Sequence, residues 1–299
     1  MQAFGADAEK ACVNRSFLFV PADSRRKLEK ASSAGADALI LDLEDSVAPD
    51  ARGEARLLAA EYLRGKDKVW VRINPIDSHD AMADLDAVMP SAPAGIVLPK
   101  PRSAADVIEL SRHIDVLEQR HGIQPGLTRI IALCTERPEA LFTLSSYAGA
   151  TDRLFGLSWG AEDLGAAVGA SANRDEQGNW LPLYEMARSF CLLAAAAAEV
   201  TALDTVFTDF RDHDGLLRYA ADARRDGFSG MLAIHPAQVE AINAAFLPSA
   251  AEVERAERIV ALFAANPGAG TLGLDGQMID RPHLVQAQRL LKMFRQIKS

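Results

Sequence analysis

The stretch DRLFGLSWGAEDLGAAVG, residues 152–169, holds an apolar run that stops at a glycine and then delivers acidic residues into a turn. Residues 154–159 are typical of a buried strand, and residues 160–164 indicate a loop that leads into a helix. Asp163 therefore lies just beyond the carboxyl end of a strand. In α/β proteins, ligands bind at this end of the strands.

The same order recurs upstream, where the apolar run of residues 129–135 ends on Glu136 before Pro138 breaks it. Glu136 and Asp163 are about one strand–helix unit apart, so we predict that they follow neighbouring parallel strands and share one rim. Two carboxylates at this spacing suit a hard divalent cation such as Mg²⁺, which leaves its other positions to water and substrate. We expect Mn²⁺ to substitute for it.

Eight short β-type runs alternate with longer amphipathic segments over most of the chain. The runs are residues 17–20, 38–43, 69–73, 95–99, 130–135, 154–159, 205–208 and 231–234. Continuous apolar runs are expected of parallel strands that are covered on both faces. Eight such alternations favour an α/β fold of the (β/α)8 TIM barrel type over a doubly wound sheet, since no Gly-x-Gly-x-x-Gly motif follows an early strand.

The pattern changes after the eighth run, where helical segments follow one another with no strand between them. These segments are residues 237–246, 250–265 and 281–298. Residues 266–276 form a glycine-rich hinge, and the whole tail is too short for a core of its own. We predict a barrel domain over residues 1–245 that holds the active site. The C-terminal helical segment, residues 246–299, is then expected to dock on the barrel or on a neighbouring subunit.

The composition is that of a soluble globular protein, with 49% hydrophobic and 24% charged residues in a chain of 299. A net charge of −9 argues against nucleic acid or an anionic membrane as the main partner, because both need a basic surface. The three cysteines, Cys12, Cys134 and Cys191, are widely spaced and predict free thiols. Since we find no signal-peptide pattern and no long apolar run, we expect a cytoplasmic protein.

Polar residues are concentrated at the predicted strand ends. Besides Glu136 and Asp163 they are Pro21, Asp23, Glu44, Asp45, Arg72, Asn74 and Lys100. Arg72 stands in an apolar strand, where a buried guanidinium is costly without a partner. It either forms a structural bridge to Glu44 or Asp45, or it binds a substrate carboxylate or enolate. We favour the second interpretation because its planar fork suits such oxyanions.

Two further strand-end residues leave alternatives open. Lys100, between two prolines, is equally consistent with a site role and with a solvent-exposed position. His235 ends the eighth run before Pro236, so its ring either belongs to the site or binds backbone groups at a helix start. The chain has no Gly-x-Ser-x-Gly motif and no Walker loop, which argues against hydrolase and NTPase functions.

Several short motifs resemble one family, the citrate lyase β-subunit-like group (HpcH/HpaI aldolase/citrate lyase), which includes malyl-CoA and citramalyl-CoA lyases. They are RSFLFVPA (15–22), LDLEDSVAP (41–49), VRIN (71–74), the strand end at Glu136, GAEDL (160–164), IHPAQV (234–239) and DGQMIDRP (275–282). The motifs occur in consistent order over nearly the whole chain. The resemblance implies a (β/α)8 barrel with a C-terminal lid, assembled as a homotrimer or hexamer.

The resemblance also implies roles for individual residues. Glu136 and Asp163 match the metal ligands, and Arg72 matches the residue that holds the substrate carboxylate and the reacting oxygen. Asp280 matches the acid/base of the lid. Ordinary helix capping is the alternative for Asp280, because Pro282 follows shortly after it.

Other residues receive supporting roles from the same resemblance. Glu44 and Asp45 match acidic residues near the water molecules of the metal. To binding of the CoA thioester we assign Arg15, Lys100 and His235. The chain departs from the family pattern, in ways that bear on substrate identity and lid contacts, at Arg52, Arg137, Pro138 and Gln277.

The resemblance implies a Mg²⁺-dependent lyase that cleaves a 3-hydroxyacyl-CoA, of the citramalyl-CoA or malyl-CoA type, to acetyl-CoA and a 2-oxo acid. Asp280 would remove the hydroxyl proton, and Arg72 would stabilise the enolate that forms. The 2-oxo acid is glyoxylate, pyruvate or oxaloacetate. Two alternatives are a malyl-CoA thioesterase and a citrate lyase β subunit that acts on a carrier-bound citryl thioester. A non-catalytic binding protein is disfavoured, since it has no need of this whole set of residues.

Overall fold

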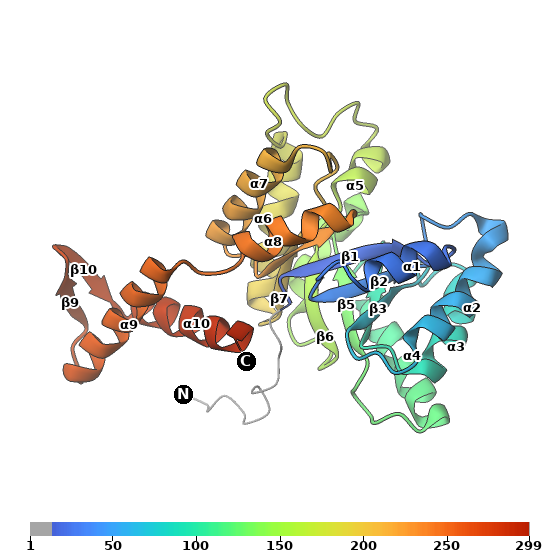
Figure 1. Ribbon diagram of the computed structural model, residues 1–299, viewed down its shortest axis with the longest axis horizontal. Coiled ribbons are helices and arrows are strands. Elements are labelled where there is room, and N and C mark those ends of the chain that lie inside the picture. The colour runs from blue at the N-terminus through green and yellow to red at the C-terminus, as the bar shows by residue number, and fades with distance from the viewer. Residues whose placement is uncertain (1–13, 299) are drawn as a thin grey trace. The chain divides into compact units, whose positions relative to one another are not determined.

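The computed structural model describes residues 14–298, and the larger part of the chain is a closed barrel of eight parallel strands. Each strand pairs with the next, and β8 pairs with β1 to close the barrel (Figure 1). The strands are β1 (Ser16–Pro21), β2 (Ala38–Asp42), β3 (Val69–Arg72), β4 (Gly95–Leu98), β5 (Arg129–Leu133), β6 (Leu154–Ser158), β7 (Thr201–Asp204) and β8 (Gly230–Ala233). The predicted (β/α)8 barrel is confirmed.

Helices connect successive strands and cover the outside of the barrel (Figure 1). The α-helices are α1 (Arg25–Ala31), α2 (Arg52–Leu63), α3 (Asp80–Val88), α4 (Ala104–His121), α5 (Ala161–Val168), α6 (Pro182–Ala197), α7 (His213–Asp226) and α8 (Val239–Ala245). The 3₁₀ helices are η2 (Pro49–Ala51), η3 (Met89–Ser91), η4 (Pro138–Tyr147) and η5 (Pro236–Gln238). Local signals set the helix ends: the Ser103 hydroxyl caps α4, and Gly122, with a φ of 66°, ends it.

Aromatic side chains fill the amino-terminal half of the barrel interior. The rings of Phe17 and Trp70 meet edge to face at 5.8 Å, and Phe155 lies 5.2 Å from Trp70. Gly95 leaves room for this cluster, since a Cβ there would lie 2.2 Å from the Trp70 ring. All three aromatic residues stand near the beginnings of their strands. The barrel is therefore closed at that end, and open space is left at the carboxyl ends of the strands.

The seventh strand lies earlier in the chain than the sequence predicted. β7 ends at Asp204, and the predicted run of residues 205–208 belongs to the loop that follows it. Asp204 is fully buried and accepts hydrogen bonds from Trp159 Nε1 at 2.7 Å and from the Tyr219 hydroxyl at 2.9 Å. Such partners make a buried carboxylate tolerable in a strand. The prediction was wrong because a search for apolar runs passes over a strand that ends in a charge.

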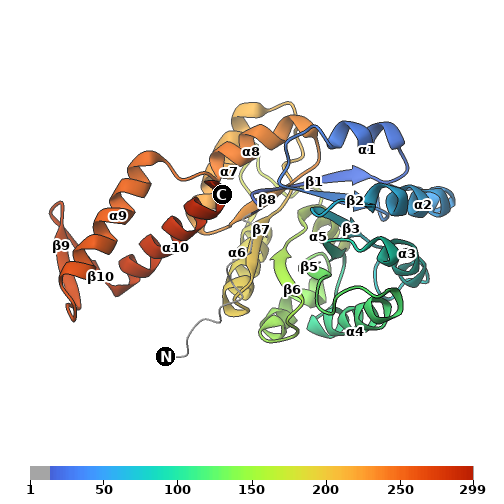
Figure 2. The same ribbon diagram turned by 60° about the horizontal axis from the view of Figure 1, so that its bottom comes forward.

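The chain from Ala244 onward forms a second compact unit, separate from the barrel unit Arg15–Asn243. Helices α9 (Ala250–Ala265) and α10 (Arg281–Lys298) lie side by side in it (Figure 2). Val253, Ile259 and Leu291 belong to an apolar cluster that holds the two helices together. The prediction that this segment lacks a core of its own was therefore wrong.

The predicted glycine-rich hinge contains a β-hairpin. Strand β9 (Thr271–Leu274) pairs antiparallel with β10 (Gln277–Asp280) across a turn made of Asp275 and Gly276. Both turn residues have positive φ, 51° and 74°, as a type I′ turn requires. An Asp-Gly pair between two short strands is a strong hairpin signal, which the sequence analysis overlooked. The hairpin delivers Asp280 to the start of α10.

In residues 14–298, no helix is long and apolar enough to span a membrane. Cys134 and Cys191 are free thiols, as predicted, and both are buried. Cys12 lies outside the described residues.

Candidate active site

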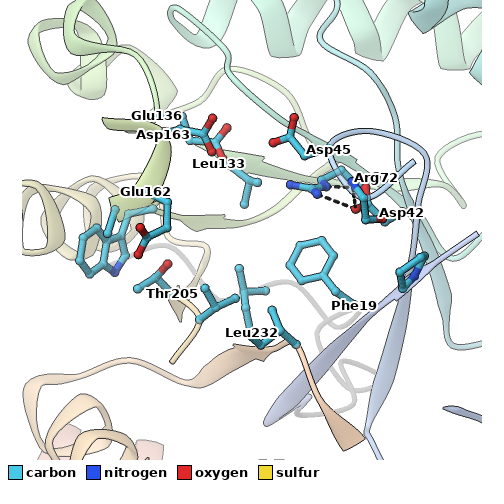
Figure 3. A pocket seen from close by; sticks show the side chains of 17 residues that line it. Phe19, Asp42, Asp45, Arg72, Leu133, Glu136, Glu162, Asp163, Thr205 and Leu232 are labelled. Atoms are coloured by element: carbon cyan, nitrogen blue, oxygen red, sulfur yellow. Dashed lines mark hydrogen bonds and ion pairs between the residues drawn. The ribbon is translucent and has the colours of Figure 1, made fainter. Parts of the chain in front are cut away.

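A cavity of about 410 Å³ opens at the carboxyl ends of the barrel strands. Asp45, Arg72, Glu136 and Asp163 are among the residues that line it. Figure 3 shows Glu136 and Asp163 together at one edge, with Arg72 pointing toward the cavity from another. The fold thus brings residues that are far apart in the sequence to one place, as the strand-end pattern predicted.

Arg72 is held by two carboxylates. Its Nε and Nη2 atoms donate to the two oxygens of Asp42 at 2.7 and 2.6 Å, and its Nη1 atom lies 3.0 Å from Glu44 Oε2. Burial opposes charge on Asp42, but the guanidinium outweighs it and holds the pKa of Asp42 below its usual value. Asp42 ends β2 directly opposite Arg72 at the end of β3. The bridge to Glu44 that was one predicted alternative is therefore present. Binding of a substrate oxyanion by Arg72 stays a prediction, and Asp42 was missed because the register between strands was unknown.

Lys100 lies inside the carboxylate cluster. Its Nζ atom is 2.6 Å from Glu44, 3.0 Å from Asp45 and 3.1 Å from Asp163. Burial opposes the ammonium charge, yet these acids raise the pKa of Lys100 above its usual value. The solvent-exposed alternative was therefore wrong. The ammonium is engaged with carboxylates, so its assignment to CoA binding stays a prediction.

Glu136 is buried and has few compensating charges. Burial raises the pKa of its carboxyl group well above the usual value, and the neighbouring acids Asp163 and Glu44 raise it further. The Lys100 backbone N–H donates to Glu136 Oε2 at 2.6 Å. Lys100 has a φ of 52°, so a left-handed backbone presents this N–H to the carboxylate. This hydrogen bond holds the Glu136 carboxylate in place, although the nearby charges of Asp163 and Glu44 oppose its ionisation.

The loop after β6 is shaped around Glu136. A Cβ atom at Gly160 would lie 2.5 Å from Glu136 Cγ, so glycine is the residue that fits there. Gly160 stands just before α5, and Asp163 lies in the first turn of that helix. This explains why the acidic residues Glu162 and Asp163 follow shortly after a glycine in the sequence. A side chain at position 160 would push the Glu136 carboxylate away from the edge that it shares with Asp163.

The donor set at this edge fits a hard divalent cation. The part of the chain that the structure describes holds no group of three or more His, Cys, Asp or Glu side chains placed to hold a metal. Mg²⁺, however, needs only one or two carboxylates and takes its remaining ligands from water and substrate. Glu136 and Asp163 supply those carboxylates, and the ammonium of Lys100 shows that the cluster accepts a cation.

Arg15 is not part of this site. It precedes β1, at the amino end of the barrel, and its Nε and Nη2 atoms donate to Asp37 at 2.8 and 2.9 Å. Its Nη1 atom also donates to the Asn243 carbonyl at 3.3 Å. The motif that contains Arg15 runs along a strand, so its first residue necessarily lies at the opposite end from the last. The assignment of Arg15 to CoA binding is therefore corrected.

His235 caps a helix at the carboxyl end of β8. Its Nδ1 atom accepts a hydrogen bond from the Ala237 N–H at 3.2 Å, as the helix-start alternative predicted. The ring also stacks on Phe210 at 4.8 Å. A smaller cavity of about 270 Å³ is lined by His235 and Pro21. CoA binding by His235 stays a prediction.

Asp280 belongs to the C-terminal unit. Its carboxylate lies 2.5 Å from His283 Nδ1, a partner that the sequence analysis did not name. In the described residues it makes no hydrogen bond to a backbone N–H of α10, as a capping side chain would. The Asp280 backbone N–H, however, donates to His283 Nδ1 at 3.2 Å, a contact that is typical of a helix start, so the capping alternative and the acid/base role both stay predictions.

A sequence model of the HpcH/HpaI aldolase/citrate lyase family matches residues 15–236 of this chain. Citrate lyase subunit beta of Haemophilus influenzae is 34% identical, over 94% of this chain and 96% of the relative. The (3S)-malyl-CoA thioesterase of Cereibacter sphaeroides is 35% identical, over 95% of each. The mitochondrial citramalyl-CoA lyase of Rattus norvegicus is 33% identical, over 95% of this chain and 87% of the relative.

A similar solved structure is that of the CitE protein from Mycobacterium tuberculosis in complex with magnesium, acetoacetate and coenzyme A. The two proteins share 34% sequence identity, with a TM-score of 0.81. The match covers 96% of this chain and 99% of the other. The similarity therefore extends beyond the barrel into the C-terminal unit.

Proposed function

The chain belongs to the HpcH/HpaI aldolase/citrate lyase family, and we propose that it is a Mg²⁺-dependent carbon–carbon lyase of the oxo-acid-lyase type. The substrate is a 3-hydroxyacyl-CoA of the citramalyl-CoA or malyl-CoA type, and the products are acetyl-CoA and a 2-oxo acid. One observation carries the proposal: Arg72, Glu136 and Asp163 line the same cavity at the carboxyl end of the barrel. They offer a cation site and an oxyanion site side by side.

Glu136 and Asp163 would hold Mg²⁺, or Mn²⁺ in its place. The bound metal would supply Lewis-acid chemistry toward the substrate oxygens. Glu44 and Asp45 would accept hydrogen bonds from the surrounding water. The related M. tuberculosis structure supports this assignment, since it contains magnesium and coenzyme A.

The protein's own residues would move the proton and stabilise the charge. Asp280 takes the proton from the substrate hydroxyl group, and the bond between the hydroxyl carbon and the thioester α-carbon breaks. The electron pair of that bond forms the enolate of acetyl-CoA, while the hydroxyl carbon becomes the 2-oxo group. Arg72 holds the developing enolate charge until the α-carbon is protonated. In this mechanism Asp280 is the acid/base, and Arg72 is the partner of the enolate oxygen.

Residues 246–299 would serve as a lid on the active site of a neighbouring subunit, in a homotrimer or hexamer in the cytoplasm. The compact packing of α9, α10 and the hairpin supports this role, because Asp280 moves with a unit that has its own apolar cluster. Closure of such a unit would exclude water from the enolate.

Two other activities are each supported by a named relative. A malyl-CoA thioesterase would release free CoA and malate, as the name of the C. sphaeroides relative suggests. A citrate lyase β subunit would act on a carrier-bound citryl thioester, as the H. influenzae relative suggests. The acid/base on the C-terminal unit favours the lyase, because carbon–carbon cleavage begins with loss of the hydroxyl proton.

Product analysis tests the proposed function. The protein is incubated with citramalyl-CoA and with malyl-CoA in Mg²⁺ buffer, and we expect acetyl-CoA and a 2-oxo acid in equal amounts. Free CoA with a hydroxy acid would identify the thioesterase instead, and dependence on an acyl carrier protein would identify the citrate lyase subunit. We expect excess chelator to stop turnover, and undiminished turnover would contradict the metal site.

Arg72→Lys is expected to lower kcat roughly 100-fold or more, with a smaller effect on KM. A lysine offers one point charge in place of the planar fork that now binds Asp42 and faces the cavity. Steady-state kinetics on citramalyl-CoA measure the effect. A variant that only raises KM would limit Arg72 to binding the ground state.

Arg56→Lys is the matched control for Arg72→Lys. Arg56, on α2, makes a comparable forked contact with Asp84 at 2.7 Å and Asp80 at 2.6 Å on α3. These residues do not line the cavity. We expect Arg56→Lys to lower thermal stability and to leave kcat nearly unchanged.

A further inference from the structure

Asp280, the acid/base of the proposed function, has a histidine as its side-chain partner. Asp280 is the last residue of β10, and His283 lies in the first turn of α10. Side chains three residues apart on a helix are neighbours, and Asp280 Oδ1 is 2.5 Å from His283 Nδ1. Within residues 14–298, no other side chain bonds to the Asp280 carboxylate. The orientation of this carboxylate therefore depends on His283.

The arginines of α9 are engaged at the other end of the hairpin. Arg255 and Arg258 lie 3.6 and 2.5 Å from Asp275, which is in the turn between β9 and β10. Asp280 stands at the open end of the same hairpin, where it pairs with Thr271. The cations of the neighbouring helix thus stabilise the turn and do not hold the Asp280 carboxylate.

One ring nitrogen serves two groups of Asp280. An oxygen and a ring nitrogen that are 2.5 Å apart need a proton between them. When Asp280 is ionised, as a base must be, this proton belongs to His283 Nδ1, which donates to Oδ1. When Nδ1 carries no proton, it can instead accept from the Asp280 backbone N–H at 3.2 Å. The first form leaves Oδ2 of Asp280 as the oxygen that can take a proton.

We propose that His283 is a positioning residue for Asp280: its Nδ1–H holds Oδ1, so that Oδ2 faces the hydroxyl group of the substrate. This inference rests on the proposed function and adds a residue to its acid/base. A base must lie within hydrogen-bond reach of the proton that it takes, and catalytic bases are often oriented by a further group. The side chains of Asp280 and His283 are 34% and 44% exposed, so a substrate can reach the pair.

A purely structural role for His283 predicts different results. The ring would then only accept the Asp280 N–H at the start of α10, as the side chain at the third helical position does in a capping box. Apolar side chains such as Ile279, Leu284 and Leu291 hold the C-terminal unit together. Loss of an exposed polar contact should therefore change stability slightly, and a structural role would leave the rates unaltered.

His283→Ala is expected to lower kcat about 10-fold to 100-fold, because a base that is free to rotate is misplaced for proton transfer. KM should change by less than about 2-fold, since His283 does not hold the substrate. We expect the melting temperature to fall by less than about 3 °C. Steady-state kinetics and melting curves of the full-length protein, with citramalyl-CoA and malyl-CoA as substrates, measure these effects.

Two further substitutions separate positioning from capping. In His283→Asn the amide nitrogen takes roughly the place of Nδ1 and can donate to Asp280 Oδ1, so we expect kcat to recover to within about 3-fold of the unaltered protein. His283→Glu supplies the acceptor of a capping box but no donor, so it should keep the melting temperature and leave kcat low. Recovery of kcat in His283→Glu, or its absence in His283→Asn, would overturn the inference.

A double-mutant cycle tests whether His283 acts through Asp280. In the Asp280→Asn background, His283→Ala should lower the residual rate by less than about 2-fold, because no carboxylate is left to position. An equally large loss in that background would show that His283 acts independently, and this would overturn the inference. Normal kcat in His283→Ala would overturn the inference alone, whereas absence of lyase turnover in the unaltered protein would contradict the proposed function and this inference with it.

Discussion

Glu136→Gln is expected to abolish Mg²⁺-dependent turnover and, in metal-free protein, to raise thermal stability at neutral pH. Both effects have one cause. Glu136 is a buried carboxylate whose pKa is raised by burial and by the charges of Asp163 and Glu44. Its negative charge is useful only when a cation is bound beside it, and otherwise it opposes folding.

The pH dependence of stability gives the sign of this effect. In the unfolded chain Glu136 loses its proton near its ordinary pKa of 4.5, whereas in the folded protein it keeps the proton to higher pH. Between these two pKa values the folded state binds more protons, so the free energy of unfolding falls as pH rises. The glutamine variant lacks this dependence. At pH 8, with chelator present, we expect the glutamine variant to melt at a higher temperature than the unaltered protein. The difference should be roughly 2–4 °C for each kcal/mol by which the substitution raises the free energy of unfolding.

Glu118→Gln is the matched control, because Glu118 is also buried but its pKa is shifted downward, whereas that of Glu136 is shifted upward. Arg153 donates to it at 2.9 and 2.5 Å, and these bonds outweigh burial and hold its pKa below the usual value. Removing its charge takes away the buried carboxylate that pairs with Arg153 and leaves the more exposed Asp115 as its counter-charge, so we expect lower stability with normal turnover. Melting curves and Mg²⁺-dependent rates are measured on both variants. If Glu136→Gln kept its turnover, Glu136 would not be a metal ligand.

The strand ends could be predicted from the sequence because their signal is local. Glu136 and Asp163 each follow an apolar run, and the closed barrel brings both runs to one rim. Arg72 was found in the same way, as a charge inside an apolar strand. Each of these predictions needed only the position of a residue in its own strand.

The contacts between strands could not be predicted because they depend on register and on loop geometry. Asp42 was missed as the partner of Arg72, since only the pairing of β2 with β3 places them side by side. Lys100 reaches three carboxylates that follow two different strands, β2 and β6, which no spacing reveals. Arg15 was misplaced because a motif does not say which end of a strand faces the site.

Asp280→Asn is expected to lower kcat by roughly 100-fold to 10,000-fold, since an amide cannot take the hydroxyl proton. The C-terminal unit should keep its fold, because Asp280 contacts the His283 ring and is not part of the apolar cluster. Asp275→Asn is the matched control. Asp275 lies in the hairpin turn of the same unit and contacts Arg258 at 2.5 Å, and asparagine accepts its positive φ. Steady-state kinetics should show nearly normal rates for Asp275→Asn.

Mixing two inactive variants decides whether Asp280 acts on its own barrel or on a neighbour. Glu136→Ala and Asp280→Ala proteins, each inactive alone, are unfolded together and reassembled. If the lid acts on a neighbouring subunit in a closed ring, random assembly places an intact barrel under an intact lid at about a quarter of the sites. If Asp280 serves its own barrel, no chain in the mixture has both residues, and activity stays absent. Recovered activity would therefore require a neighbouring lid, whereas mixed oligomers without activity would confine Asp280 to its own subunit.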